Sequence, residues 1–200
     1  MKTVTTANIT TLIRGIIDDN LKTDGETSHR YDSSASFLLA HSYVSSSTIK
    51  VYKNGTLLTL TTDYTYNSGT NRVTVIASLT KNDDILITYS YYEHYSDSEI
   101  LSFIRASLPE FVKHRYSKYF YVNDNSEVVT MNGTNPSVQE ANIIALITAI
   151  KMNPNNISIR TKDFTISAEE NKTPSEQIDD IFIQWTRSFG NIDFLEQEDS

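Results

Sequence analysis

A stretch between Ile49 and Tyr92 constrains the fold more than any other part of this sequence, because only there is a strand pattern sustained over a long distance. Apolar residues recur at every second position in four short runs, which is the spacing of half-buried β-strands. The runs comprise Ile49 and Val51, Tyr64 and Tyr66, Val73 and Val75, and Ile85, Ile87, Tyr89 and Tyr91. Turn-forming residues such as Asn54-Gly55 separate them. The pattern predicts a small antiparallel sheet or sandwich.

Helical patterns lie on both sides of this stretch. From Thr6 to about Leu21 the apolar residues follow helical spacing, which predicts a first helix. Residues 96–99, 137–140 and 173–176 each begin with Ser or Thr and end with Glu, the arrangement that satisfies free N–H groups at a helix start. Pro109 should kink or break the second helix. The helix after Ser137 is apolar nearly all round, so we expect it at the centre.

The predicted fold class is therefore α+β: a small bundle of about four helices with an antiparallel β module inserted after the first helix. The expected parts are a helical domain of residues 1–25 and 94–190, a β module of residues 26–93, and an acidic C-terminal tail of residues 191–200.

Three connecting segments are harder to assign from their patterns. Residues 22–47 are rich in Ser and Asp and predict a loop with one strand around 36–43. Residues 123–136 predict a polar loop. Residues 157–166 alternate again, which fits either a two-stranded ribbon or an extended arm.

Composition limits what the chain can do. Its 200 residues are 38% hydrophobic, which is enough for a packed core. The net charge of -8 argues against general nucleic-acid binding, and the lack of cysteine excludes disulfides and cysteine-ligated metals. Neither a signal peptide nor an apolar run long enough for a bilayer is present, so we expect a soluble protein that is not exported and has no membrane partner.

The sequence shows no pattern typical of an active site. The four histidines are scattered, and adjacent acidic residues such as Asp83-Asp84 do not form an acid/base pair or the ligand spacing of a calcium loop. With six glycines, a nucleotide-cradling loop is hard to place. We therefore predict no catalytic, cofactor-binding or metal-binding residues, and we do not expect an enzyme.

One segment, Lys113 to Tyr121, interleaves basic and aromatic side chains. Arg115, Lys118 and Tyr119 are candidate interface residues, because Tyr and Arg are common at protein interfaces. The same pattern also fits nucleic-acid stacking, or basic residues that complement a helix C-terminus while the aromatic rings pack against the β module.

The acidic tail contains apolar residues as well. Phe194 and Leu195 stand among Glu196, Glu198 and Asp199. This composition fits either a frayed end or a hook that packs on a neighbouring subunit.

Two groups of motifs resemble proteins of tailed bacteriophages. The segments Val51-Tyr52-Lys53-Asn54-Gly55, Asp63-Tyr64-Thr65-Tyr66 and Asp83 to Tyr89 resemble small β repeats of virion proteins. The helical frame, with the possible hairpin of residues 157–166 and the helix around Trp185, resembles head–tail connector, or neck adaptor, proteins. Many connectors have only a short loop in place of the β module.

The resemblance to connectors implies a structural role. Such proteins form a ring, typically dodecameric, beneath the portal protein; they join the capsid to tail or nozzle proteins and line the exit path of the genomic double-stranded DNA without sequence-specific binding. It also implies a location in the neck of the virion after assembly in the host cytoplasm. The interface candidates in this frame are Trp185, Phe189, Phe194 and Leu195.

Two other functions fit the sequence. The chain could be another phage tail or baseplate protein whose tyrosine-rich β module binds a host receptor glycan, since tyrosine rings can pack against sugars. A small hydrolase would need a buried cluster of carboxylates or histidines, which the sequence does not display.

Overall fold

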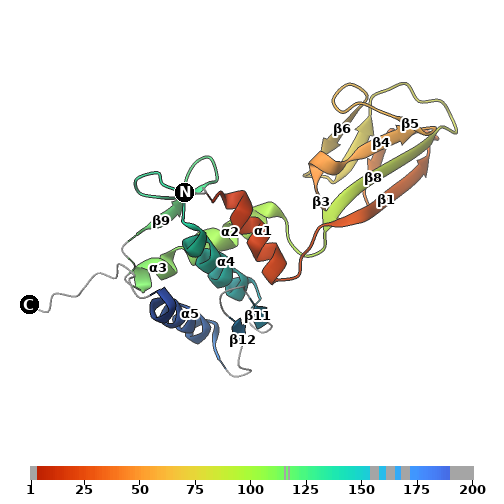
Figure 1. The fold of residues 1–200 in the computed structure, drawn as a ribbon. Helices are drawn as coiled ribbons and strands as arrows, with labels where there is room; N and C mark the ends of the chain where they lie inside the picture. The colour runs from red at the N-terminus through yellow and green to blue at the C-terminus, as the bar shows by residue number, and fades with distance from the viewer. Residues whose placement is uncertain are drawn as a thin grey trace, which may run out of the picture. The chain divides into compact units, whose positions relative to one another are not determined.

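The computed structural model describes residues 4–114, 116, 118–153, 158–160, 165–167 and 172–189, and it has a mixed α+β fold with several antiparallel sheets (Figure 1). The chain divides into two compact units. Unit 1 consists of Met1–Asp18 and Asp97–Ser200, and unit 2 of Asp19–Ser96. The sequence analysis placed these boundaries at residues 25/26 and 93/94.

The helices all belong to unit 1 apart from one 3₁₀ turn, η1 (Ser46–Thr48), in unit 2. They are α1 (Thr6–Ile16), α2 (Asp97–Ser107), α3 (Pro109–Lys113), α4 (Val138–Met152) and α5 (Pro174–Phe189). As predicted, α4 is central: it packs against α1, α2 and α5 (Figure 1). Most of its side chains are buried.

Local chemistry explains where these helices begin and end. The predicted capping box is present at α4, where Ser137 and Glu140 exchange hydrogen bonds with each other's backbone N–H groups. Pro109 ends the second helical stretch and begins α3, because proline lacks the N–H that a helix interior needs. The first helix stops at Ile16, earlier than the predicted Leu21, since Asp18 adopts a left-handed conformation with φ of 58°.

Two short hairpins complete unit 1. Strands β9 (Phe120–Val122) and β10 (Val128–Thr130) pair antiparallel, so the prediction of a plain polar loop over residues 123–136 was wrong. Strands β11 (Ser158–Arg160) and β12 (Thr165–Ser167) also pair antiparallel. Of the two predicted alternatives, a two-stranded ribbon and an extended arm, this pairing agrees with the ribbon.

Unit 2 contains two antiparallel sheets that share one core, which agrees with the sandwich, one of the two predicted alternatives. The larger sheet has the order β1 (Lys22–Arg30), β8 (Asp84–Tyr92), β4 (Lys50–Lys53) and β5 (Thr56–Leu57), with β3 (Tyr43–Val44) also paired to β8. The smaller sheet has the order β2 (Ser36–Leu38), β7 (Arg72–Val75) and β6 (Tyr64–Asn67). Side chains from both sheets, including Val51, Val73 and Ile87, form a single buried cluster.

The longest element that the sequence patterns missed is β1. It pairs with β8 at the edge of the larger sheet, although residues 22–35 were predicted to be loop. The residues of β1 that face inward are Gly25, Thr27 and His29. None of them is a large apolar residue, so the strand lacks the usual apolar alternation. Just before β1, the buried carboxylate of Asp19 accepts hydrogen bonds from the N–H groups of Glu93 and His94 and ties the two ends of unit 2 together.

Candidate protein interface

The hairpin of β9 and β10 and the first turn of α4 expose four large apolar side chains. Their exposed fractions are 47% for Tyr119, 42% for Tyr121, 74% for Met131 and 53% for Val138. We call these four residues the hairpin surface. Tyr119 and Met131 line a common hollow, and exposed apolar side chains that lie together are typical of sites that contact other proteins.

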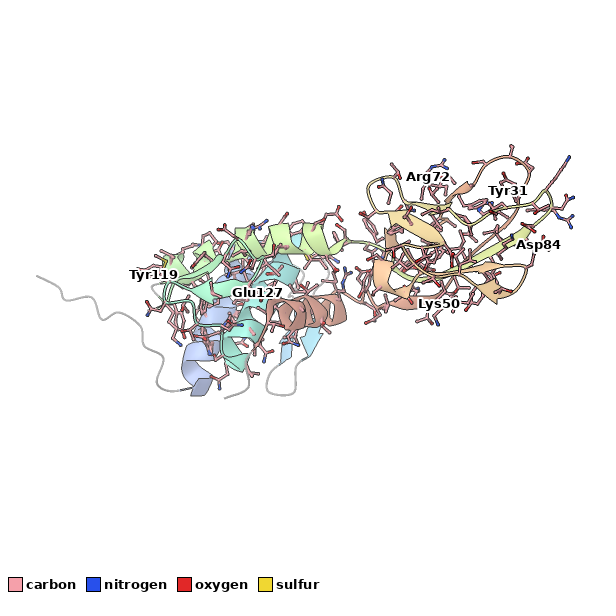
Figure 2. The ribbon with its side chains drawn as sticks, turned by 90° about the horizontal axis from the view of Figure 1, so that it is seen from above. Tyr31, Lys50, Arg72, Asp84, Tyr119 and Glu127 are labelled. Atoms are coloured by element: carbon pink, nitrogen blue, oxygen red, sulfur yellow. The ribbon has the colours of Figure 1, made fainter. Side chains whose placement is uncertain are left out.

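A hollow of about 250 Å³ lies within this surface. Tyr119 and Met131 line it together with Lys118, Thr130, Asn135 and Glu140. Tyr119 lies at the outer edge of unit 1 in Figure 2. The structure thus brings the predicted residues Lys118 and Tyr119 together with Met131, which the sequence analysis did not identify.

Glu140 forms the polar wall of the hollow and is only 3% exposed. Its carboxylate accepts hydrogen bonds from the hydroxyl of Tyr116 at 2.7 Å, from Nζ of Lys118 at 2.8 Å and from the N–H of Ser137 at 2.7 Å. Burial alone would raise the pKa of Glu140, but these donors together hold its pKa below the ordinary value. The carboxylate is therefore an ionised structural anchor that joins Tyr116, Lys118 and the start of α4.

The hairpin is fixed to α1 by side chains from both elements. Oε2 of Glu127 accepts hydrogen bonds from the N–H and the hydroxyl of Thr6 at 3.0 and 2.9 Å, beside the start of α1 (Figure 2). The hydroxyl of Thr6 in turn accepts from the N–H of Val128, and the amide of Asn135 donates to the carbonyl of Val4. The carboxylate of Glu127 also complements the positive end of the α1 dipole. These bonds hold the hairpin surface on a firm support.

Trp185, predicted as an interface residue, lies in the core of unit 1. It is 7% exposed and packs against Phe111, Tyr116 and Phe182, with ring centroids 5.0 to 6.3 Å apart. Little of this side chain is available to a partner. Arg115, Phe194 and Leu195 lie outside the described residues, as does the side chain of Phe189, whose backbone ends α5.

The basic end of α3 is used for packing against α5. The imidazole of His114 stacks on Phe182 at 4.1 Å, and its Nε2 lies 3.2 Å from Oδ1 of Asp179. Burial lowers the pKa of His114, and the nearby Asp179 opposes this shift only in part. Lys113 also reaches α5, where its Nζ donates to the hydroxyl of Ser175.

Of the three interpretations of this segment, the structural one describes His114, whereas Lys113, Lys118 and Tyr119 are about half exposed. The aromatic rings of Tyr116 and Phe120 pack on Phe111 inside unit 1, so their expected packing against the β module was wrong.

In unit 2 many tyrosines that could have bound a glycan point into the protein. The hydroxyl of Tyr64 donates to the carbonyl of Ile49, and that of Tyr89 accepts from the N–H of Ala40. Tyr91 is 8% exposed and stacks on His41 at 3.6 Å. These rings serve the core of the sandwich.

Asp83, the residue considered for calcium, holds a turn instead. Its carboxylate accepts hydrogen bonds from the N–H of Thr80 and the amide of Asn54, and it pairs with Nζ of Lys53. Among the described residues no three His, Asp or Glu side chains gather closely enough to hold a metal ion. Within the same part of the chain, none of the helices combines the length and the apolar character needed to cross a bilayer.

No protein-family model, no curated protein and no solved structure matches this chain significantly.

Proposed function

We propose that this chain is a structural virion protein, a head–tail connector that forms a ring beneath the portal of a tailed phage and joins the capsid to the tail. In this proposal the helices form the connector frame, and unit 2 is a β module inserted after the first helix. The observation that carries the proposal is the hairpin surface, in which Tyr119 and Met131 are exposed around a hollow on a firmly held support.

The chemistry of this surface favours protein contact over catalysis. A partner that covers the exposed parts of these side chains gains about 25 cal/mol for each Å² of apolar area removed from water. The one carboxylate in the hollow, Glu140, accepts hydrogen bonds from Tyr116, Lys118 and Ser137, and these donors hold its pKa below the ordinary value, which makes it a poor base for proton transfer. Such a surface supports side-by-side assembly with other copies, or contact with portal and tail proteins.

The overall charge also suits a conduit for DNA. With a net charge of -8, the protein repels the phosphate backbone more than it attracts it. The genome would therefore pass through such a ring without sequence-specific binding.

The test is to label this protein with an antibody in intact virions of its source and to locate the label by electron microscopy. Several copies in a ring at the neck are the expected result. Label at the distal tail or fibres would overturn the connector proposal and favour a tail or baseplate protein with a receptor-binding β module. Absence of label from the virion would overturn both the connector proposal and the tail or baseplate alternative.

A variant makes the test specific to the hairpin surface. Met131→Glu places a charge in the proposed contact and should strongly reduce incorporation into virions. Ile76→Glu is the matched control, because Ile76 is an exposed apolar residue of unit 2, 57% accessible, outside that surface. Equal incorporation of the two variants would exclude the hairpin surface as the assembly contact.

A further inference from the structure

Strand β1 forms one edge of the larger sheet in unit 2, beside β8 (Figure 1). Among the described residues no strand pairs with its outer side. It is nine residues long, whereas β5 at the opposite edge has two. The outer side of an edge strand presents unpaired N–H and C=O groups, to which another strand can add. The length of β1 makes it the larger of the two edges open to such a contact.

The hydrogen bonds of β8 show which residues of β1 face outward. A strand inside an antiparallel sheet directs the backbone groups of alternate residues to its two neighbours. The carbonyl groups of Asp84 and Ser90 accept hydrogen bonds on the side of β4 and β3, whereas that of Asp83, directly before β8, accepts one on the side of β1. The odd-numbered residues of β8 therefore face β1, where they lie opposite residues 25, 27 and 29.

The backbone groups of Glu26, Ser28 and Arg30 therefore point away from β8, and we call these three residues the outer edge. All three residues are exposed. Within the described part of the chain, no turn, loop or side chain forms a hydrogen bond with their N–H and C=O groups. The bulge between Lys22 and Gly25 interrupts the regular register before the outer edge begins. The regular part of the edge thus runs from Glu26 to Arg30.

The charges of the outer edge complement those of a second copy of the same edge. If two copies pair antiparallel about Ser28, each Glu26 lies directly opposite Arg30 of the second copy, and all three residues can exchange backbone hydrogen bonds. Opposite charges across a strand pair are favourable, and like charges are unfavourable. A register centred on Glu26 would place like charges together. A register that pairs Asp24 with Arg30 would use a residue in the bulge.

The side chain of Arg30 is available for this contact. Its Nε lies 3.6 Å from Oδ1 of Asp84, and 70% of the side chain is still exposed. In the pairing about Ser28, the guanidinium would lie between Asp84 of its own chain and Glu26 of the second copy. It would therefore gain a second carboxylate without losing the first.

We propose that two copies of this chain pair antiparallel through the outer edge of β1, centred on Ser28, so that their larger sheets form one continuous sheet. The same surface is used by both copies, so the contact closes at two and does not propagate into a fibre. This inference goes beyond the proposed function, because it concerns unit 2 and not the hairpin surface of unit 1.

The first test is sedimentation of the full chain over a range of concentrations. Every protein in this test carries Met131→Glu, which disfavours association through the hairpin surface. A dimer is the expected result, and a monomer at all concentrations up to about 1 mM would overturn the proposal. Ser28→Pro should abolish the dimer, because it removes the central N–H donor. The fold should tolerate this proline, since the N–H faces outward from an edge strand.

Charge reversal tests the register and does not depend on the folding of the proline variant. Glu26→Arg and Arg30→Glu each place like charges opposite one another, and each should weaken dimerisation about tenfold. In a mixture of the two variants, the heterodimer again has opposite charges at both pairs and should form about as tightly as the parent dimer. Arg72→Glu, the same change on the smaller sheet, is the control and should leave dimerisation unchanged.

Two results of the charge reversal would overturn the proposal: dimerisation of both single variants as tight as that of the parent, or a mixture that associates no more tightly than either variant alone. Dimerisation that persists in a folded Ser28→Pro variant would do the same. These outcomes are separate from antibody labelling of the virion, which reports on the connector role, so either idea can fail alone.

Discussion

The ring of Tyr89 on β8 lies so close to Gly25 on β1 that a Cβ at residue 25 would stand 2.6 Å from two ring carbons and from the carbonyl oxygen of Tyr89. A bulge between Lys22 and Gly25 accompanies this close approach. The Tyr89 hydroxyl is held at the same time by Ala40, His41 and Thr27. The ring therefore has no room to move away from residue 25.

We expect Gly25→Ala to lower the free energy of unfolding of unit 2 by about 2–3 kcal/mol, because the added methyl group must displace a packed ring or the strand itself. Chemical denaturation followed by circular dichroism in the β-sheet region measures the effect.

Gly15→Ala is the matched control for this substitution. Gly15 lies in α1, where an added Cβ meets nothing within 4 Å, so alanine should stabilise the helix by up to about 1 kcal/mol. A Gly25→Ala variant as stable as the parent would show that Tyr89 is not fixed as described.

Glu140 should make unit 1 sensitive to acid. Its pKa is lowered in the folded chain, even though burial alone would raise it, because Lys118, Ser137 and Tyr116 donate to the carboxylate. The unfolded chain thus takes up this proton first as the pH falls. The stabilisation is complete above about pH 5 and is lost as the pH falls through the lowered pKa of the folded state.

The Glu140→Gln variant should be less stable than the parent by about 2 kcal/mol at pH 7, with the difference shrinking toward pH 3. The measurement is urea unfolding at several pH values, followed by the fluorescence of Trp185, the only tryptophan in the chain and a residue of unit 1. Asp124→Asn, at an exposed position of the same hairpin, is the control and should keep the parent's pH dependence. Parallel curves for parent and Glu140→Gln would contradict the prediction.

Glu127 should stabilise α1 from outside the helix. Glu127→Ala leaves the N–H of Thr6 without its acceptor and removes a negative charge from the helix start, at an expected cost of about 1–2 kcal/mol. Thermal unfolding monitored by Trp185 fluorescence tests this, with Asp124→Ala as the control. If the two substitutions have equal effects, the link between the hairpin and α1 contributes nothing to stability.

Trp185 should matter for stability more than for assembly. Trp185→Ala opens a cavity among Phe111, Tyr116 and Phe182, and should cost about 3–5 kcal/mol in unit 1. Ile183→Ala is the control on the same helix, since Ile183 is 47% exposed and should change stability by less than about 0.5 kcal/mol. Circular dichroism at 222 nm follows both variants. A Trp185→Ala protein of normal stability would favour the original interface assignment.

The elements that could be predicted are those whose apolar pattern and capping residues lie within one continuous stretch of sequence. The apolar run of α4 and its capping box at Ser137 sit in one continuous stretch, and so does the proline that separates α2 from α3 at residue 109. In unit 2 the alternation in β8 directly reflects burial of Ile85, Ile87 and Tyr89. In each case neighbouring residues alone determine the structure.

Elements that depend on distant partners could not be found in this way. Strand β1 forms because β8 offers hydrogen bonds along its edge, while its own inward residues are Gly, Thr and His. The apolar residues of α5 recur at helical spacing, which correctly predicts a helix with one buried face. The spacing does not specify what covers that face, and for this reason Trp185 was assigned to an interface.

The candidate site was only half predictable for the same reason. Lys118 and Tyr119 stood out because they lie in a basic and aromatic run. Met131 follows Val128 and Val129 in an otherwise polar segment, and it becomes part of the surface through the pairing of β9 with β10. Local signals were the β-branched pair Val128-Val129 within β10 and the turn sequence Asn132-Gly133 directly after it.

The carboxylate of Asp19 has a consequence for how this protein could change over generations. By binding the N–H groups of Glu93 and His94, it makes the entry and exit of unit 2 adjacent points. A gene segment that encodes a domain with neighbouring ends can be exchanged, shortened or lost in one recombination event without lengthening the connections that remain. Relatives of this chain that differ in this segment can therefore keep the same helices while carrying an entirely different β unit.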